Sequence, residues 1–300
     1  MEYEINKVLF IINKFSGTGY QSQLEGRILD ACRDANVECT IEFTQGPRHA
    51  TELARSGTRE DFNLIVAVGG DGTMNEVAQG LVNSPVAMGI IPRGSGNGLA
   101  RHLGTPLHVE KAAQMLFQSV PVNIDTFTIN NKLSLNVSGI GFDGQVAKQF
   151  ATRGKRGLVT YAKVALEEYS KFKEFDAHIT VAGKELERKS FIIALANSSQ
   201  YGNNVKVAPL ASICDQKLHI SILKKVPAYR MDFIYSFLKG EVNKSTFCET
   251  IETDKINIKL AKPIAYHVDG EPCDEEDHFT IEIQPASLSM MVPKKNINRV

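Results

Sequence analysis

The chain has 300 residues, 43% of them hydrophobic, which is enough for one large or two ordinary domains with a real core. Lysine plus arginine equals aspartate plus glutamate at 34 each, so the formal charge of 0 gives no global sign of nucleic-acid binding. Five cysteines show neither a CxxC pair nor zinc-finger spacing. This pattern, with no signal peptide and no transmembrane stretch, predicts a cytoplasmic protein with free thiols.

Strand and helix patterns alternate through the first 120 or so residues. Strand patterns lie at 8–12, 38–43, 63–68 and 86–91, and helical patterns lie at 22–36, at 49–56, from 74 onwards and near 99. Alternation of this kind favours a parallel sheet with helices on both faces. We therefore predict a doubly wound α/β domain over residues 1–123.

Short strand patterns dominate after residue 122. They lie at 125–129, 133–137, 177–181, 190–196, 217–223, 255–260, 265–268 and 278–283, and only 160–172 and 230–239 have clear helical patterns. This texture is typical of an antiparallel β-sandwich. We predict such a domain over residues 124–285, and we expect residues 286–300 to return to the first domain.

The run Gly69-Gly70-Asp71-Gly72-Thr73 follows a strand pattern that suits burial on both faces. Thr73 and Glu76 have the spacing of a capping box, so a helix is expected from Met74. Backbone N–H groups at a helix start attract phosphate, but a carboxylate repels it unless it holds a cation or takes a proton. Asp71 therefore indicates Mg²⁺ or a base; the alternative is a turn residue in a tight strand-to-helix connection.

Three more turn-forming segments follow strands, at 13–19, 44–49 and 93–98. The carboxyl ends of parallel strands meet at one edge of a sheet, where ligands bind. We expect these segments and 69–73 to lie together.

Six motifs in this order resemble the lipid kinase family of diacylglycerol kinases and sphingosine kinases. They read NKFSG at 13–17, VAVGGDGTMNEV at 66–77, IIPRGSGNG at 90–98, SGIGFDG at 138–144, APLASICDQKL at 208–218 and VDGEP at 268–272. The resemblance covers nearly the whole chain. It implies ATP-dependent phosphorylation of a lipid hydroxyl, with the active site in a crevice between the α/β domain and the β-sandwich.

The resemblance also assigns site residues. The cofactor ATP is expected at Asn13, Lys14, Phe15, Ser16, Gly17, Thr44, Gly69, Gly70, Asp71, Gly72, Thr73, Met74, Asn75, Glu76, Val77, Ser95 and Asn97. Two of the family's carboxylates are catalytic: Asp71 is linked to Mg²⁺ through water, and Glu271 accepts a proton. Asp143 is placed at the lipid headgroup, and a further magnesium site takes the carboxylate of Asp215 with the backbone carbonyls of Ser212 and Lys217.

From spacing alone, other readings of these residues stay open. Glu271 follows Asp269-Gly270, a favoured hairpin turn, and Asp215 fits a solvated turn before a strand. The basic run at 153–156 suits either anionic lipid headgroups or a solvated loop.

The substrate and the reaction also have alternatives. The second glycine loop, with Ser95 and Asn97, is similar to that of sphingosine and ceramide kinases, and glycine at 98 replaces the acid of bacterial diacylglycerol kinases. An NAD kinase shares the loop at 69–73, and a nucleotide- or lipid-binding regulator is the non-enzyme alternative. As partners we expect a lipid substrate, transient contact with the inner membrane surface, a homodimer and no nucleic acid.

Overall fold

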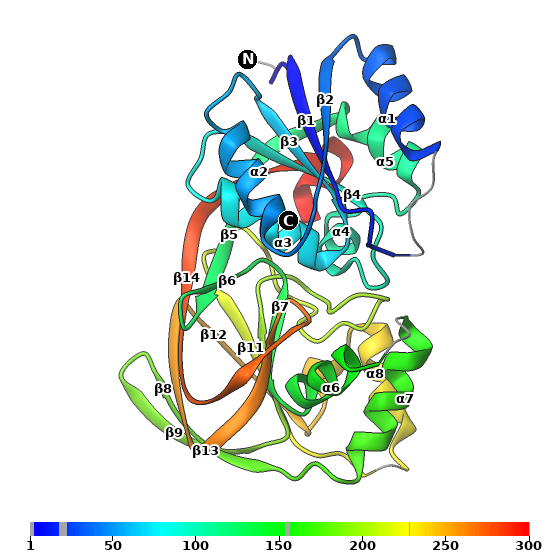
Figure 1. Cartoon of the computed structure of the whole chain (residues 1–300). Helices are drawn as coiled ribbons and strands as arrows, with labels where there is room; N and C mark the ends of the chain where they lie inside the picture. Colours follow the sequence, from blue (N-terminus) through cyan, green and yellow to red (C-terminus); the bar gives the residue numbers. More distant parts are fainter. Residues whose placement is uncertain (1–2, 18–22, 154–156, 228, 300) are drawn as a thin grey trace. The chain divides into compact units, whose positions relative to one another are not determined.

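The computed structural model describes residues 3–17, 23–153, 157–227 and 229–299 (Figure 1). Ser22, where the first helix was expected to begin, and residues 154–156 of the basic run lie outside this part. Contacts divide the chain into two compact units, Met1–Ile124 with Pro285–Val300, and Asp125–Gln284. Among the described residues, no helix combines the length and the apolar character needed to cross a membrane.

The first unit is a parallel α/β structure. Its elements are β1 (Lys7–Ile12), α1 (Gln23–Asp34), β2 (Glu38–Phe43), α2 (His49–Gly57), β3 (Leu64–Gly69), α3 (Asp71–Leu81), β4 (Ala87–Pro92), α4 (Gly98–Leu103), α5 (Val109–Leu116) and the 3₁₀ helix η2 (Lys294–Arg299). β4, β3, β1 and β2 are neighbours in that order, all parallel. The end of β14 (Glu271–Pro293) joins beside β4, where Met290 pairs with Met88.

Burial on both sides explains the apolar strands of this unit. Every residue of β3 and β4 is buried. α1 and α5 pack on one face of the sheet, over Phe10 and Val66 (Figure 1). The other face carries α2 and α3: a side chain at Gly57 would strike Leu9 and Ile65, so α2 lies close against the strands there.

The second unit is antiparallel. Its elements are β6 (Lys132–Ser134), β7 (Val137–Gly141), α6 (Phe142–Ala151), α7 (Leu158–Tyr169), β8 (Phe175–Val181), β9 (Lys184–Ser190), β10 (Ile192–Ala196), β11 (Leu218–Leu223), α8 (Met231–Lys239), η1 (Val242–Lys244), β12 (Cys248–Thr253) and β13 (Lys255–Val268), and β5 (Ser119–Ile129) enters it from the first unit. β12, β11, β10, β7 and β13 are neighbours in that order.

β13 makes the sandwich possible because its two halves pair with different strands. Residues 256–260 pair with β8, whereas Tyr266 and His267 pair with β7. The pairing of β13 with β14 changes register between Lys259 and Tyr266, where one half gives way to the other. β10 alternates, with Ile193 and Leu195 in the central core and its alanines in a second cluster under α8. The α/β plus β-sandwich class expected from the sequence is confirmed.

Several local expectations were wrong. The single strand expected at 133–137 is two, β6 and β7, and α5, α6, β9 and β12 were missed. β9 reads KELERKS and buries only its last residue, so it has no apolar alternation to detect. α6 begins at the Gly-Phe-Asp-Gly motif, whose glycines are typical of a turn.

His102 on α4 gives the first unit a dependence on pH. Burial lowers the pKa of His102 from 6.5 to about 4. The unfolded chain therefore binds more protons between these two values, and the free energy of unfolding should fall as pH drops, by about 2 kcal/mol at pH 5. Urea unfolding at pH 7 and pH 5 measures this: His102→Leu should remove most of the difference, and His108→Leu, at an exposed position, should keep it. An equal slope in both variants would contradict the assignment.

Candidate active site

The four segments at the carboxyl ends of the strands meet in the first unit as expected, apart from residues 18 and 19, which lie outside the described residues. The N–H of Thr44, after β2, donates to the carbonyl of Ile12 at 3.0 Å. The side chain of Asn13 donates from Nδ2 to Oγ1 of Thr73 at 3.0 Å, and its Oδ1 accepts the N–H of Phe15 at 2.9 Å. Asn13 thus ties the first segment to the glycine loop at 69–73.

The two glycine loops touch backbone to backbone. A Cβ added at Gly94 would lie 2.7 Å from Cα of Gly70, so a side chain does not fit between them. Gly17 has φ of +67°, and a Cβ there would lie 2.0 Å from the carbonyl oxygen of Arg93. Gly70 has φ of −92°, which any residue can adopt, so the need for glycine at this position comes from the close approach of the Gly94 backbone.

Asp71 joins the two loops through its carboxylate. Oδ2 accepts the N–H of Asn97 and Oδ1 accepts the N–H of Gly98, each at 2.9 Å. Gly98 begins α4, so the carboxylate lies on the positive end of a helix. Asn97, in a left-handed conformation with φ of 51°, holds its own loop by hydrogen bonds to both the N–H and the carbonyl of Gly94.

The predicted capping box at the start of α3 is wrong. α3 begins at Asp71, directly after Gly70, and not at Met74. Oγ1 of Thr73 accepts from Asn13 instead, and Oε2 of Glu76 accepts the N–H of Ala50 at 3.3 Å, at the start of α2. Glu76 therefore supports a neighbouring helix.

The other residues assigned to the nucleotide differ in their exposure. Met74 and Val77 are 1% and 0% exposed as whole residues and belong to the core, so the structure presents neither of them to a ligand. Ser16 and Thr44 are buried, and Ser95 and Phe15 are exposed. Nζ of Lys14 lies 3.6 Å from the centre of the Phe43 ring, and Asn75 accepts a hydrogen bond from Gln79.

Glu271 lies in the second unit, directly after the turn between β13 and β14. Asp269 and Gly270 both have positive φ, 49° and 89°, which fits the expected hairpin turn. The carboxylate of Asp269 accepts hydrogen bonds from the Ser134 hydroxyl at 2.6 Å and from the N–H groups of Leu135 and Asn136 at 2.9 and 3.0 Å. Glu271 itself is exposed, in contrast to the buried acid two residues before it.

Asp143, assigned to the lipid headgroup, is only 5% exposed. Its Oδ1 accepts the N–H of Gly144 at 2.9 Å, and its Oδ2 accepts the hydroxyl of Tyr201 at 2.8 Å. Burial, together with the charge of Asp143, raises the pKa of Tyr201 well above its usual value, so the hydroxyl keeps its proton. Asp143 is thus part of a buried polar group.

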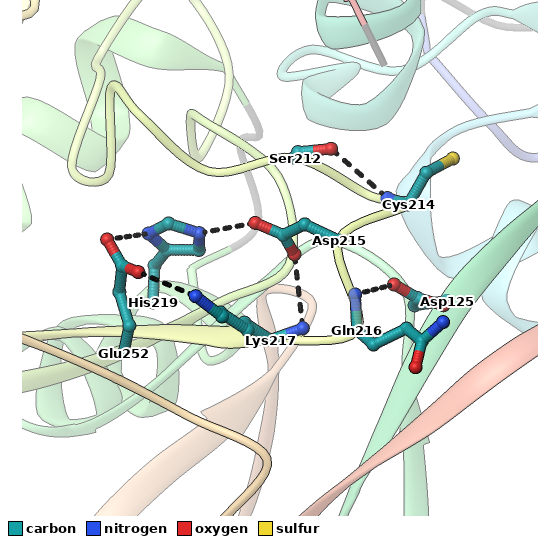
Figure 2. Close-up of polar contacts among 8 residues, drawn as sticks. All are labelled: Asp125, Ser212, Cys214, Asp215, Gln216, Lys217, His219 and Glu252. Carbon is teal, nitrogen blue, oxygen red and sulfur yellow. Dashed lines mark hydrogen bonds and ion pairs between the residues drawn. The ribbon is translucent and has the colours of Figure 1, made fainter.

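Asp215 lies between His219 and Lys217, both of which also contact Glu252 (Figure 2). Its Oδ1 accepts the N–H of Lys217 at 3.1 Å, and its Oδ2 lies 3.1 Å from Nε2 of His219. The hydroxyl of Ser212 accepts the N–H of Cys214, whose thiol has its pKa raised to about 11 by burial and the charges of Asp125 and Asp215. No cluster of three or more His, Cys, Asp or Glu side chains in the described chain could hold a metal ion, so the magnesium site at Asp215 stays a prediction.

Sequence reasoning missed three polar residues that contact these carboxylates: Tyr201 and His267 beside Asp143, and His219 beside Asp215. It also missed that the carboxylate of Asp269 fixes the turn before Glu271. The spacing of four between Asp215 and His219 was visible in the sequence. The contacts of Asp143 with Tyr201 and His267 span more than 50 residues and left no local pattern.

Comparisons with known proteins agree across both units. Residues 7–129 match the model of the diacylglycerol kinase catalytic domain, and residues 136–292 match that of the YegS C-terminal NAD kinase beta sandwich-like domain. A diacylglycerol kinase of Bacillus subtilis is 26% identical, over 89% of this chain and 90% of its own length. A protein of Chromohalobacter salexigens named "Probable lipid kinase YegS-like" is 27% identical, over 90% and 87%.

Solved structures support the same fold. A crystal structure of a diacylglycerol kinase from Bacillus anthracis superposes with a TM-score of 0.76 at 21% identity, covering 98% of this chain and 99% of that one. At that identity the likeness concerns the fold alone. Since the second family model alone covers more than half of the chain, and the first covers most of the remainder, the chain belongs to the family of diacylglycerol-kinase-like lipid kinases.

Proposed function

We propose that this protein transfers the γ-phosphate of ATP to the hydroxyl of a lipid, either a diacylglycerol or a sphingoid base. The observation that carries the proposal is the joining of the two glycine loops by Asp71. It fixes the half-buried backbone of residues 70–72 at the carboxyl edge of the sheet, where α/β proteins bind nucleotides. The match of this unit to a diacylglycerol kinase catalytic domain supports the same reading.

The nucleotide phosphates are proposed to lie against the loops at 13–17, 69–73 and 93–98. Glycines at 70 and 94 leave no room for side chains between the loops, so a ligand meets backbone there. Backbone N–H groups and the start of α3 favour an anion. Met74 and Val77, buried as whole residues, are proposed to support the loop from the core rather than to contact the phosphates.

Asp71 is the residue proposed to hold Mg²⁺ on the nucleotide side. A carboxylate oxygen is a ligand of the kind that Mg²⁺ prefers, and bonds from two N–H groups favour the ionised form that a cation needs. When bound, the ion neutralises phosphate charge during transfer. Asp215, with the carbonyls of Ser212 and Lys217, is proposed for a second ion because this donor set also consists of oxygen atoms.

Glu271 is proposed to accept the proton of the lipid hydroxyl. Phosphoryl transfer needs an acceptor for that proton as the oxygen attacks. An exposed carboxylate at a rigid turn suits the task better than Asp269, whose oxygens are engaged with the 134–136 segment. Asp71 belongs to the first unit and Glu271 to the second, so their joint action on one substrate is part of the proposal.

The substrate is tested by offering purified protein radiolabelled ATP with diacylglycerol, sphingosine and NAD in separate reactions. We expect label in a lipid and none in NAD. NAD stays the second candidate because the second unit matches a sandwich of NAD kinase type, while the match of the first unit favours a lipid. Label in NAD alone, or in no acceptor, would overturn the proposal.

Asp71→Asn should affect both turnover and stability. We expect kcat to fall by orders of magnitude, because the amide cannot replace a carboxylate beside the cation. An amide also presents NH₂ to one of the two N–H groups, so the free energy of unfolding should fall by about 1–2 kcal/mol. Kinetics and urea unfolding measure the two effects.

Asp61→Asn, at an exposed turn of the same unit, is the matched control and should change stability by less than about 0.5 kcal/mol. Unchanged turnover in Asp71→Asn would remove Asp71 from the mechanism. Unchanged stability would show that its bonds to α4 contribute little.

We propose that α7 supplies the contact with the membrane that a lipid substrate requires. Val159, Ala162, Lys163 and Leu166 recur at helical spacing and are all exposed, with Val159 at 85% and Leu166 at 78%. Residues 152–174 carry six lysines and arginines against three glutamates, in a chain whose formal charge is 0. An exposed apolar face on a segment with an excess of basic residues in its sequence suits an anionic bilayer.

Replacing Leu158, Val159 and Leu166 together by serine should weaken binding to phosphatidylglycerol vesicles by about tenfold or more, since about 1.4 kcal/mol of lost apolar burial is a factor of ten. Co-sedimentation measures the binding. Leu29→Ser, at an exposed position of α1, should leave it unchanged. Equal binding by the triple variant and the unchanged protein would exclude α7 as the membrane contact.

A further inference from the structure

A buried histidine lies directly behind the turn that carries Glu271. His267, on β13, is 2% exposed, and its Nδ1 accepts the N–H of Gly270 at 3.0 Å. Because an N–H points at Nδ1, that nitrogen carries no proton, and in the neutral ring the proton is on Nε2. One ring nitrogen therefore holds the turn and the other faces away from it.

Nε2 of His267 faces a carboxylate that is itself fixed. It lies 3.4 Å from Oδ2 of Asp143, the oxygen that also accepts the hydroxyl of Tyr201. His267 pairs with Gly139 across β7 and β13, and a Cβ at Gly139 would come within 1.7 Å of Oδ2 of Asp143. Because residue 139 is glycine, there is space beside it for the imidazole of His267 and the carboxylate of Asp143 to meet.

The turn is thus held at two consecutive residues. The carboxylate of Asp269 binds the 134–136 segment, and the N–H of Gly270 binds His267. The exposed carboxylate of Glu271 makes no hydrogen bond or ion pair with a residue in the described ranges. Its position is therefore set by the backbone of the turn rather than by contacts of its own.

We propose that His267 is a positioning residue for Glu271. Asp143 and Tyr201 fix the ring with its proton on Nε2, which leaves Nδ1 as an acceptor that orients the peptide between Asp269 and Gly270, directly before Glu271. The inference rests on the proposed role of Glu271 as proton acceptor. It gives Asp143 a second role beside the one expected at the lipid headgroup: Asp143 supports the proposed base, Glu271, through His267.

The tautomer can be tested without any assay of activity. In the unchanged protein, ¹⁵N NMR of the neutral imidazole should show Nε2 protonated and Nδ1 unprotonated. The other tautomer, with the proton on Nδ1, would overturn the proposal because Nδ1 could not then accept from Gly270. This result is readable even if no substrate is phosphorylated, so it is independent of the proposed function.

Two substitutions separate the nitrogens of the ring. His267→Gln keeps a polar group near the place of Nε2 and loses the acceptor at Nδ1, whereas His267→Asn keeps an acceptor near Nδ1. We expect His267→Gln to lower kcat by about 10- to 100-fold, as small misplacements of a reacting group do, with KM for ATP and lipid nearly unchanged. His267→Asn should recover about tenfold of that loss, and His178→Gln, at an exposed histidine, is the control. Equal losses in both His267 variants would contradict the role of Nδ1.

A double-mutant cycle with Glu271→Gln then identifies the group through which His267 acts. Glu271→Gln alone should lower kcat. In the Glu271→Gln background, adding His267→Gln should lower kcat by less than about threefold, because moving the turn has little effect once the base itself is gone. Fully additive losses would mean that His267 acts elsewhere. If Glu271→Gln retains full activity while the unchanged protein phosphorylates a lipid, the role of Glu271 fails together with this inference.

Discussion

The hydrogen bonds accepted by the carboxylate of Asp71 are the interaction on which the proposed nucleotide site depends. The carboxylate binds the N–H groups of Asn97 and Gly98, which belong to a different strand-end loop, and so joins loops that are about 25 residues apart in sequence. The glycines at 70 and 94 allow the backbones to approach this closely. An acid beside a phosphate is unfavourable by itself. Here the start of α4 stabilises its charge, so the same carboxylate serves the fold and is the one proposed to hold a cation.

The second unit uses carboxylates in a comparable way. Asp269 and Asp143 are buried, accept several hydrogen bonds and fix the backbone around them. Glu271 is exposed and takes its position from the turn. Buried carboxylates with full sets of donors are rigid, whereas a general base must be able to accept a proton from the substrate. Burial thus separates the acids that fix the fold from Glu271, the acid proposed to react, whose position depends on supporting residues.

The sequence predicted the fold class, the strand-end loops and the turn at Asp269-Gly270 because these depend on local patterns of apolar residues and glycine. It failed where tertiary contacts decide. The Thr73 and Glu76 pair has capping-box spacing, yet Thr73 bonds to Asn13 and Glu76 to the start of α2. β9 is polar and is a strand because β8 pairs with it along its whole length. The role of His267 could not be predicted from the sequence, because its contact with Asp143, 124 positions earlier in the chain, exists only in the folded structure.

The central claim is that the loops joined by Asp71 serve phosphoryl transfer to a lipid. The most direct measurement is mass spectrometry of a total lipid extract incubated with ATP, Mg²⁺ and the purified protein. The account predicts that one class of lipid with a free hydroxyl gains a phosphate and that its unphosphorylated form is depleted in step. An extract in which every lipid is unchanged, while the protein is folded and its ATP is supplied in excess, would contradict it.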